Sequence, residues 1–229
     1  MKCVYMQIYK TKSLIIFAVL FILTLSSCAT NRSILNIDPN KKISSTPLNR
    51  SAIIRSVTDA REFMDKPPTP DIPSLGQGGI SKHSPELRSR AIGRKRNGYG
   101  KALGDVFLDE TNSVQKLIVN ALTNVLNKHG YKIYDIDSNY SPETVFIDIT
   151  INKFWSWLDI DFWSIGIEAE IDTNITITYT DRKTKSISAQ TSNRVMAATD
   201  SAWKETLDSI LHSYEKSAEK ELEFLAVNK

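Results

Sequence analysis

The chain has 229 residues, of which 41% are hydrophobic and 24% charged, a composition that suits one ordinary globular domain. Both cysteines, Cys3 and Cys28, lie near the start, which excludes a disulfide or a thiolate metal site in the rest of the chain. Residues 1–27 hold three lysines and no acidic residue, and removing these three from the 29 basic side chains leaves 26, equal to the 26 acidic ones. The sequence therefore gives no indication of a nucleic-acid partner.

The first 27 residues have the layout of a secretory signal. Lys2, Lys10 and Lys12 precede an apolar run from Leu14 to Leu25. This run is shorter than the roughly 20 residues that a permanent membrane-spanning helix needs. We expect residues 1–27 to be a lipoprotein signal peptide that is removed.

A lipobox follows directly, since Leu25-Ser26-Ser27-Cys28 places a branched apolar residue and two small ones before a cysteine. Lipid on the Cys28 thiol and then on its new amine gives firm attachment, because several acyl chains hold far better than one. In a Gram-negative cell, Ala29 rather than Asp after the cysteine indicates the outer membrane, facing the periplasm. The expected anchor is therefore lipidated Cys28.

The rest of the chain divides in two. Residues 28–50 are polar, without apolar periodicity, and predict a flexible tether. Residues 51–229 predict a single domain with a Pro- and Gly-rich insert, residues 63–87, that reads as a long irregular loop.

Within the domain, the expected elements alternate in kind. In chain order they are a strand at 51–57, a strand pair at 91–96 and 99–108 around an Asn97-Gly98 turn, a helix at 114–129, a strand at 131–136, strands at 145–155, 163–179 and 187–196, and a helix at about 201–225. Strict alternation in the later strands indicates an antiparallel sheet with one wet face. We expect an α+β fold of two layers, with a mainly antiparallel sheet and two amphipathic helices packed on one face.

Several of these segments together resemble the YajG-like family of uncharacterised bacterial lipoproteins. They are the lipobox, the strand that ends in Val57-Thr-Asp-Ala-Arg61, Ile92-Gly93 with Asn97-Gly98-Tyr99-Gly100, the helix from Val114 to Gly130-Tyr131, and the closing helix at Trp203–Leu211. The resemblance covers most of the chain after Cys28 except the insert. It implies an α+β envelope domain and no known enzyme activity or catalytic residue.

The sequence shows no pattern typical of a catalytic or metal site, which favours a protein that is not an enzyme. His83, His129 and His212 have no metal-ligand spacing, and no nucleophile elbow or phosphate loop is present. Glu168, Glu170 and Asp172 alternate along one strand and are best interpreted as its solvated face. We expect no catalytic residue, cofactor or metal.

Two segments are candidate contact surfaces. The basic segment holds Arg88, Arg90, Arg94, Lys95 and Arg96, and it either meets anionic lipid, glycan phosphate or an acidic partner, or is simply solvated. The aromatic segment holds Trp155, Trp157, Phe162 and Trp163 at the expected turn between two strands. It either plugs the core, contacts a protein partner or touches the membrane interface.

The function expected from these patterns is that of a lipid-anchored envelope protein that acts by binding, as an accessory or assembly factor with an envelope protein partner. The alternative is a ligand-binding or enzymatic module with a pocket between helices and sheet.

Overall fold

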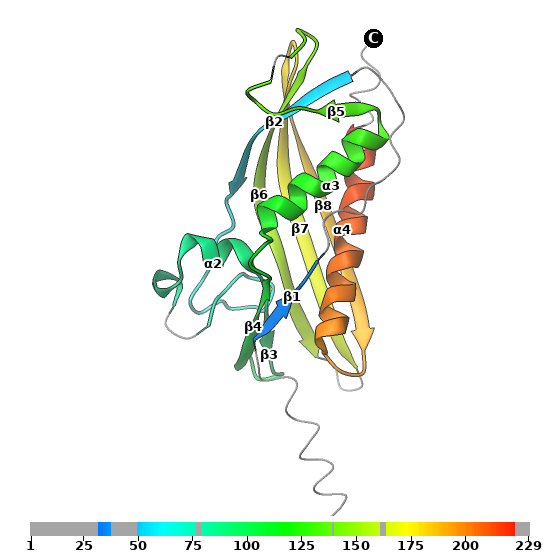
Figure 1. Ribbon diagram of the computed structural model, residues 1–229. Helices are drawn as coiled ribbons and strands as arrows, with labels where there is room; N and C mark the ends of the chain where they lie inside the picture. The colour runs from blue at the N-terminus through cyan, green and yellow to red at the C-terminus, as the bar shows by residue number, and fades with distance from the viewer. Residues whose placement is uncertain (1–31, 38–49, 77–78, 139, 161–163, 223–229) are drawn as a thin grey trace, which may run out of the picture.

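The computed structural model describes residues 32–37, 50–76, 79–138, 140–160 and 164–222, so Cys28, Phe162 and Trp163 lie outside the described residues. The described chain forms an α+β fold, as expected, with eight strands in one mixed sheet and three α-helices (Figure 1). In chain order they are β1 (Ser33–Leu35), β2 (Arg50–Asp59), α2 (Pro85–Arg90), β3 (Ala91–Arg96), β4 (Ala102–Leu108), α3 (Val114–Lys128), β5 (Tyr131–Ile133), β6 (Val145–Ile160), β7 (Ile165–Thr178), β8 (Arg182–Val195) and α4 (Asp200–Leu222).

The sheet is organised around β6. One edge of β6 pairs antiparallel with β7 along its whole length, and β7 pairs antiparallel with β8, which confirms the predicted meander. The other edge pairs first with β2 and then with β3, both in parallel. The short pairs β1–β4 and β2–β5 are also parallel, so the sheet is mixed, while its longest ladders are antiparallel as expected. Parallel neighbours need a crossover, and the chain from β3 to β6, which contains β4 and α3, supplies one of these.

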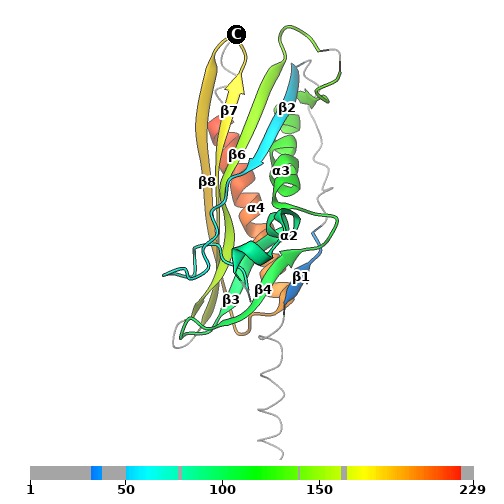
Figure 2. The ribbon, with the colours of Figure 1, turned by 90° about the vertical axis from the view of Figure 1, so that its left-hand side faces the viewer.

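The two long helices cover the same face of the sheet, as predicted (Figures 1 and 2). Helix α3 begins at Val114 because the Ser113 side chain accepts a hydrogen bond from the Lys116 amide, and it is followed by Gly130 at a φ of 80°. Helix α4 packs on β7 and β8, where its buried Tyr214 hydrogen-bonds Thr173 at 2.8 Å. The main core fills the space between these helices and the sheet.

A second, smaller core lies on the opposite face. Phe107 belongs to it, whereas its strand neighbours Val106 and Leu108 belong to the main core, as the alternation of side chains along a strand requires. The insert supplies the cover, with Leu75 buried and Phe63 and Leu87 packed against it. In their described part, residues 63–87 are mostly without regular secondary structure, as predicted, apart from a 3-10 turn at Ile80–Lys82 and the start of α2, and they pack over this second core.

The structure differs from two of the expected segment boundaries. The tether was expected to extend from residue 28 to residue 50, but Ser33–Leu35 form β1, paired with β4, and Leu35 and Ile37 are buried. A three-residue parallel strand has no periodicity by which the sequence could reveal it. The strand expected at 187–196 begins earlier, at Arg182.

Candidate functional site

The aromatic segment is strand, not turn, up to Ile160. A bulge at Asn152 determines which face of the sheet each ring lies on. Ile151 and Lys153 pair with the consecutive β7 residues Thr173 and Asp172, so Asn152 is an extra residue in β6. One extra residue exchanges the two faces of a strand, so Phe154 and Leu158 enter the main core and Trp155 turns to the opposite side.

Trp155 lies in the second core and offers no contact surface. Its side chain is 1% exposed, its ring meets Phe63 edge-on at 6.0 Å between centroids, and its indole N–H donates to the Pro70 carbonyl at 3.2 Å. The interpretation of Trp155 as a core residue therefore fits the structure, although the core in question is the one under the insert and not the helix–sheet core.

Trp157 is half-buried at the margin of the same cluster. The Lys153 ammonium lies 5.5 Å from the centre of its ring and forms ion pairs with Glu170 at 2.7 Å and Asp71 at 3.2 Å. Burial alone would lower the pKa of Lys153, but the hydrogen bonds and charges of Glu170 and Asp71 outweigh it and the pKa is raised. This lysine ties the insert to β6 and β7 and stays charged.

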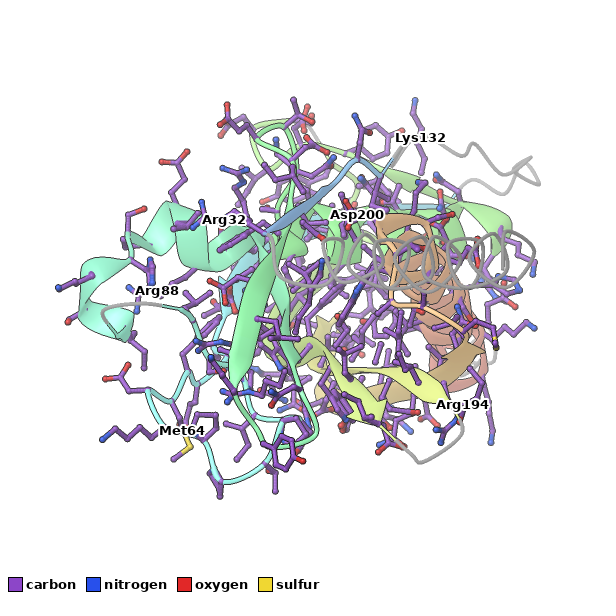
Figure 3. All side chains as sticks on the ribbon, turned by 90° about the horizontal axis from the view of Figure 1, so that it is seen from below. Arg32, Met64, Arg88, Lys132, Arg194 and Asp200 are labelled. Carbon is purple, nitrogen blue, oxygen red and sulfur yellow. The ribbon has the colours of Figure 1, made fainter. Side chains whose placement is uncertain are left out.

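The basic residues do not form a patch, because most of them hold the fold together. Arg94 donates to the Leu75 carbonyl at 2.5 Å and Arg96 to the Ser74 hydroxyl at 3.0 Å, so both secure the insert. Arg90 donates twice to the Leu108 carbonyl, and the Arg88 carbonyl accepts from Arg61 at 2.8 Å. Figure 3 places Arg88 at the outer margin of the insert side, far from Arg194. The prediction of a shared basic contact surface is therefore not supported.

Lys95 points the other way, as its position between Arg94 and Arg96 on a strand requires. It is 1% exposed and lies 3.7 Å from the Asp200 carboxylate at the start of α4. The same carboxylate accepts a hydrogen bond from the Ser33 hydroxyl. Asp200 thus joins the first residue of β1 to β3 and to α4, near the middle of the end view in Figure 3.

The carboxylates and histidines that were considered as catalytic or metal-binding residues lie apart from one another. Glu168 accepts from Ser192 at 2.6 Å and lies 3.9 Å from Arg194, and Asp172 lies within 3.4 Å of Asn152 and Ser186. Within the described ranges, no group of three or more His, Cys, Asp or Glu side chains is placed to hold a metal ion. His212 lies on α4 and His83 on the insert, on opposite faces of the sheet.

A groove of about 570 Å³ lies between α3 and α4 and not between helices and sheet. Leu117 and Leu211 supply apolar walls, while Asn124 and Glu215 are hydrogen-bonded to each other at 3.0 Å. The buried side chain of Ile37 also lines the groove.

One end of the sheet carries apolar side chains that the sequence reasoning missed. We call it the Tyr99 end: it comprises the β3–β4 turn, the last residue of β6 and the start of the β8–α4 connection, and it lies at the bottom of Figures 1 and 2. Tyr99 and Met196 are each 97% exposed there, and Ile160 is 42% exposed. Asn97-Gly98 was predicted as a turn, but only the sheet topology brings Tyr99, Ile160 and Met196 to the same end.

No helix among the described residues has the length and apolar character to cross a membrane. No family model and no curated protein sequence matches the chain.

The solved structures similar to the chain include the following three. A structure described only as an uncharacterised protein is 7% identical, covers 84% of this chain and 99% of its own, and gives a TM-score of 0.42. A protein of Xanthomonas campestris from the DUF330 family is 9% identical, with 82% and 91% covered and a TM-score of 0.39. A Helicobacter pylori homolog of neuraminyllactose-binding hemagglutinin is 12% identical, with 82% and 92% covered and a TM-score of 0.38. Proteins this distant in sequence often differ in function even where the fold is shared.

Proposed function

We propose that the protein is a lipid-anchored bacterial envelope protein that acts by binding, as an accessory or assembly factor, with no catalytic activity. The observation that carries the proposal is the lipobox Leu25-Ser26-Ser27-Cys28 directly after an apolar run, four residues before the described chain begins at Arg32. Ala29 favours the outer membrane, facing the periplasm. The motifs shared with the YajG-like lipoproteins support the same assignment.

The absence of catalysis is supported by what the polar side chains do. The strongest candidates for acid–base chemistry, Glu168 and Glu170, each lie in an ion pair with a cation on a neighbouring strand. A catalytic carboxylate needs a cleft that can hold a substrate beside it, and these side chains stand on a strand face.

A binding role is supported by the outer edge of β8, which pairs with no further strand among the described residues. This strand has 14 residues and, in the part of the chain that the structure describes, pairs only with β7. Its charged residues stand at the two ends, while residues 186–193 carry no charge. Unpaired amide and carbonyl groups along such an edge can take up an extended segment of a partner as one more strand.

The anchor is tested with the two cysteines. Cys28→Ser removes the thiol that would receive lipid, so we expect an uncleaved precursor and no incorporation of labelled palmitate, measured by gel mobility and metabolic labelling. Cys3→Ser is the matched control, because Cys3 lies within the signal and should be dispensable. Normal maturation and labelling of the Cys28→Ser protein would refute the anchor.

The binding surface is tested by a photo-reactive amino acid in the native membrane. Placed at Gln190 on β8, it should crosslink one discrete partner, detected as a band of fixed added mass. Thr150 on β6 is the control, since it faces the same side of the sheet but lies on an interior strand. Equal crosslinking from both positions, or none from Gln190, would show that the β8 edge is not the partner surface.

A further inference from the structure

The start of the described chain lies close to the Tyr99 end. Ser33 pairs with Val106 in parallel register, so Arg32 stands level with Asp105, three residues from the start of β4 at Ala102. Three strand residues span about 10 Å. Because β1 is parallel to β4, which runs away from the Tyr99 end, the chain enters β1 from that end.

The short connection limits how far the anchor can lie from the domain. Only four peptide units join Cys28 to Arg32, and a fully extended chain of that length reaches about 14 Å. This reach is comparable to the roughly 10 Å between Arg32 and the start of β4 beside that turn. At the opposite end, the β7–β8 turn with Tyr179 lies some 14 paired residues away along β6 and β7, or about 45 Å.

The side chains at the Tyr99 end suit a lipid–water interface. Tyr99 and Met196, at 97%, are far more exposed than the next large hydrophobic among the described residues, Ile34 at 59%. Tyrosine is favoured at membrane interfaces because its ring is apolar and its hydroxyl is wet.

The turn that carries Tyr99 is built to hold it outward. The Asn97 side-chain oxygen accepts from the Tyr99 amide at 3.0 Å and the Lys101 amide at 2.9 Å. Gly100, at a φ of 76°, donates to the Asn97 carbonyl, and its own carbonyl accepts from Arg96 at 2.9 Å. So many local bonds around a fully exposed ring indicate a fixed presentation of that ring.

Charge at this end is compatible with anionic head groups. Asp159 forms an ion pair with Arg194 at 3.2 Å, and Asp200 lies beside Lys95. Exposed Lys101 stands at the same end. Arg32 lies about 10 Å from this end along β4, with its guanidinium 4.9 Å from the centre of the Phe107 ring, and the end view of Figure 3 shows Arg32 and Arg194 on opposite sides. Cations beside interfacial aromatic residues favour a lipid surface over solvent.

We propose that the Tyr99 end rests on the membrane that holds the anchor, with Tyr99 and Met196 entering the head-group region of the bilayer. This inference rests on the proposed lipid anchor and adds an orientation to it. Strands β6, β7 and β8 extend from the membrane into the aqueous space, and the β7–β8 turn with Tyr179 lies farthest from the bilayer.

The test uses the processed, lipidated protein in vesicles of phosphatidylethanolamine and phosphatidylglycerol. A fluorophore is attached through Tyr99→Cys or Met196→Cys, and a lipid with a nitroxide close to its head group serves as quencher. Tyr179→Cys is the matched control, a tyrosine in a hairpin turn at the far end of the same strands. We expect quenching at positions 99 and 196 to be several-fold stronger than at 179.

Flotation with the vesicles is read in the same samples and separates the two proposals. If the protein floats but positions 99 and 196 are quenched no more than 179, the orientation is wrong while the anchor stands. If the wild-type protein does not float, the anchor fails and the orientation fails with it. The substitutions should leave unfolding curves unchanged, because both side chains are almost fully exposed.

Discussion

Trp155→Ala is expected to destabilise the protein by about 3–5 kcal/mol, the usual cost of deleting a large buried aromatic side chain. Trp155 is 1% exposed and is the largest side chain of the second core, which among the described residues has three other buried members, Leu75, Ala91 and Phe107. So small a cluster has few neighbours that can move into the cavity. The insert should therefore loosen from the sheet, which urea unfolding and the rate of trypsin cleavage after the exposed Lys82 would both measure.

Two matched variants separate the effect of the buried Trp155 ring from that of its indole hydrogen bond and from that of a neighbouring ring. Trp155→Phe keeps most of the ring and loses the indole bond to the Pro70 carbonyl, so its cost should be nearer 1 kcal/mol. Trp157→Ala removes a half-buried ring at the margin of the cluster and should leave trypsin cleavage almost unchanged. If Trp155→Ala and Trp157→Ala cost the same small amount, Trp155 does not secure the insert.

The sequence predicts the elements whose signal is local and repeated. Apolar residues at helical spacing defined α3 and α4 to within three residues of their observed ends, and alternation defined β7. The Asn97-Gly98 turn and the strands on either side of it were predicted for the same reason.

The errors have a different origin, because they depend on contacts between distant segments. The bulge at Asn152 falls where the alternation breaks at two consecutive polar residues, Asn152 and Lys153, but this break alone does not reveal that Trp155 then faces the insert. Likewise the role of Arg94, Lys95 and Arg96 depends on which carbonyls and carboxylates the fold brings to them, so a run of positive charge in the sequence became a set of separate internal bonds. The Tyr99 end follows from sheet topology and could not be read from any one segment.

Arg61 lies where β6 changes its pairing partner from β2 to β3, and its role likewise depends on contacts between distant segments. The β2 ladder on β6 ends at Ile151 and the β3 ladder begins at Ser156, and Gly93 permits the close approach of β3, since a Cβ there would lie 2.6 Å from the Ser156 carbonyl oxygen. Between the two ladders, the Arg61 guanidinium donates to the Phe154 carbonyl at 3.1 Å and to the Ala91 carbonyl at 2.6 Å. Between the two ladders, the Arg61 side chain thus supplies hydrogen bonds that a neighbouring strand would otherwise supply.

We expect Arg61→Met to cost about 3–5 kcal/mol, measured by urea unfolding, because it leaves buried acceptors and a carboxylate without their partner. The side chain is 0% exposed, and both oxygens of Asp59 accept from it at 2.8 Å. Adding Asp59→Asn should recover only part of the loss, since the Phe154 and Ala91 carbonyls stay unsatisfied.

Arg55→Met is the matched control, because Arg55 lies on β2, the strand that ends just before Arg61, and pairs with Asp148 while remaining 41% exposed. An exposed pair of this kind contributes at most about 1 kcal/mol. A similar small loss for Arg61→Met would mean that solvent or a local shift satisfies the gap in the sheet. A large loss at Arg61 alone would show that the sheet depends on one arginine to join β2 and β3 along β6, the strand from which both the insert and the Tyr99 end are positioned.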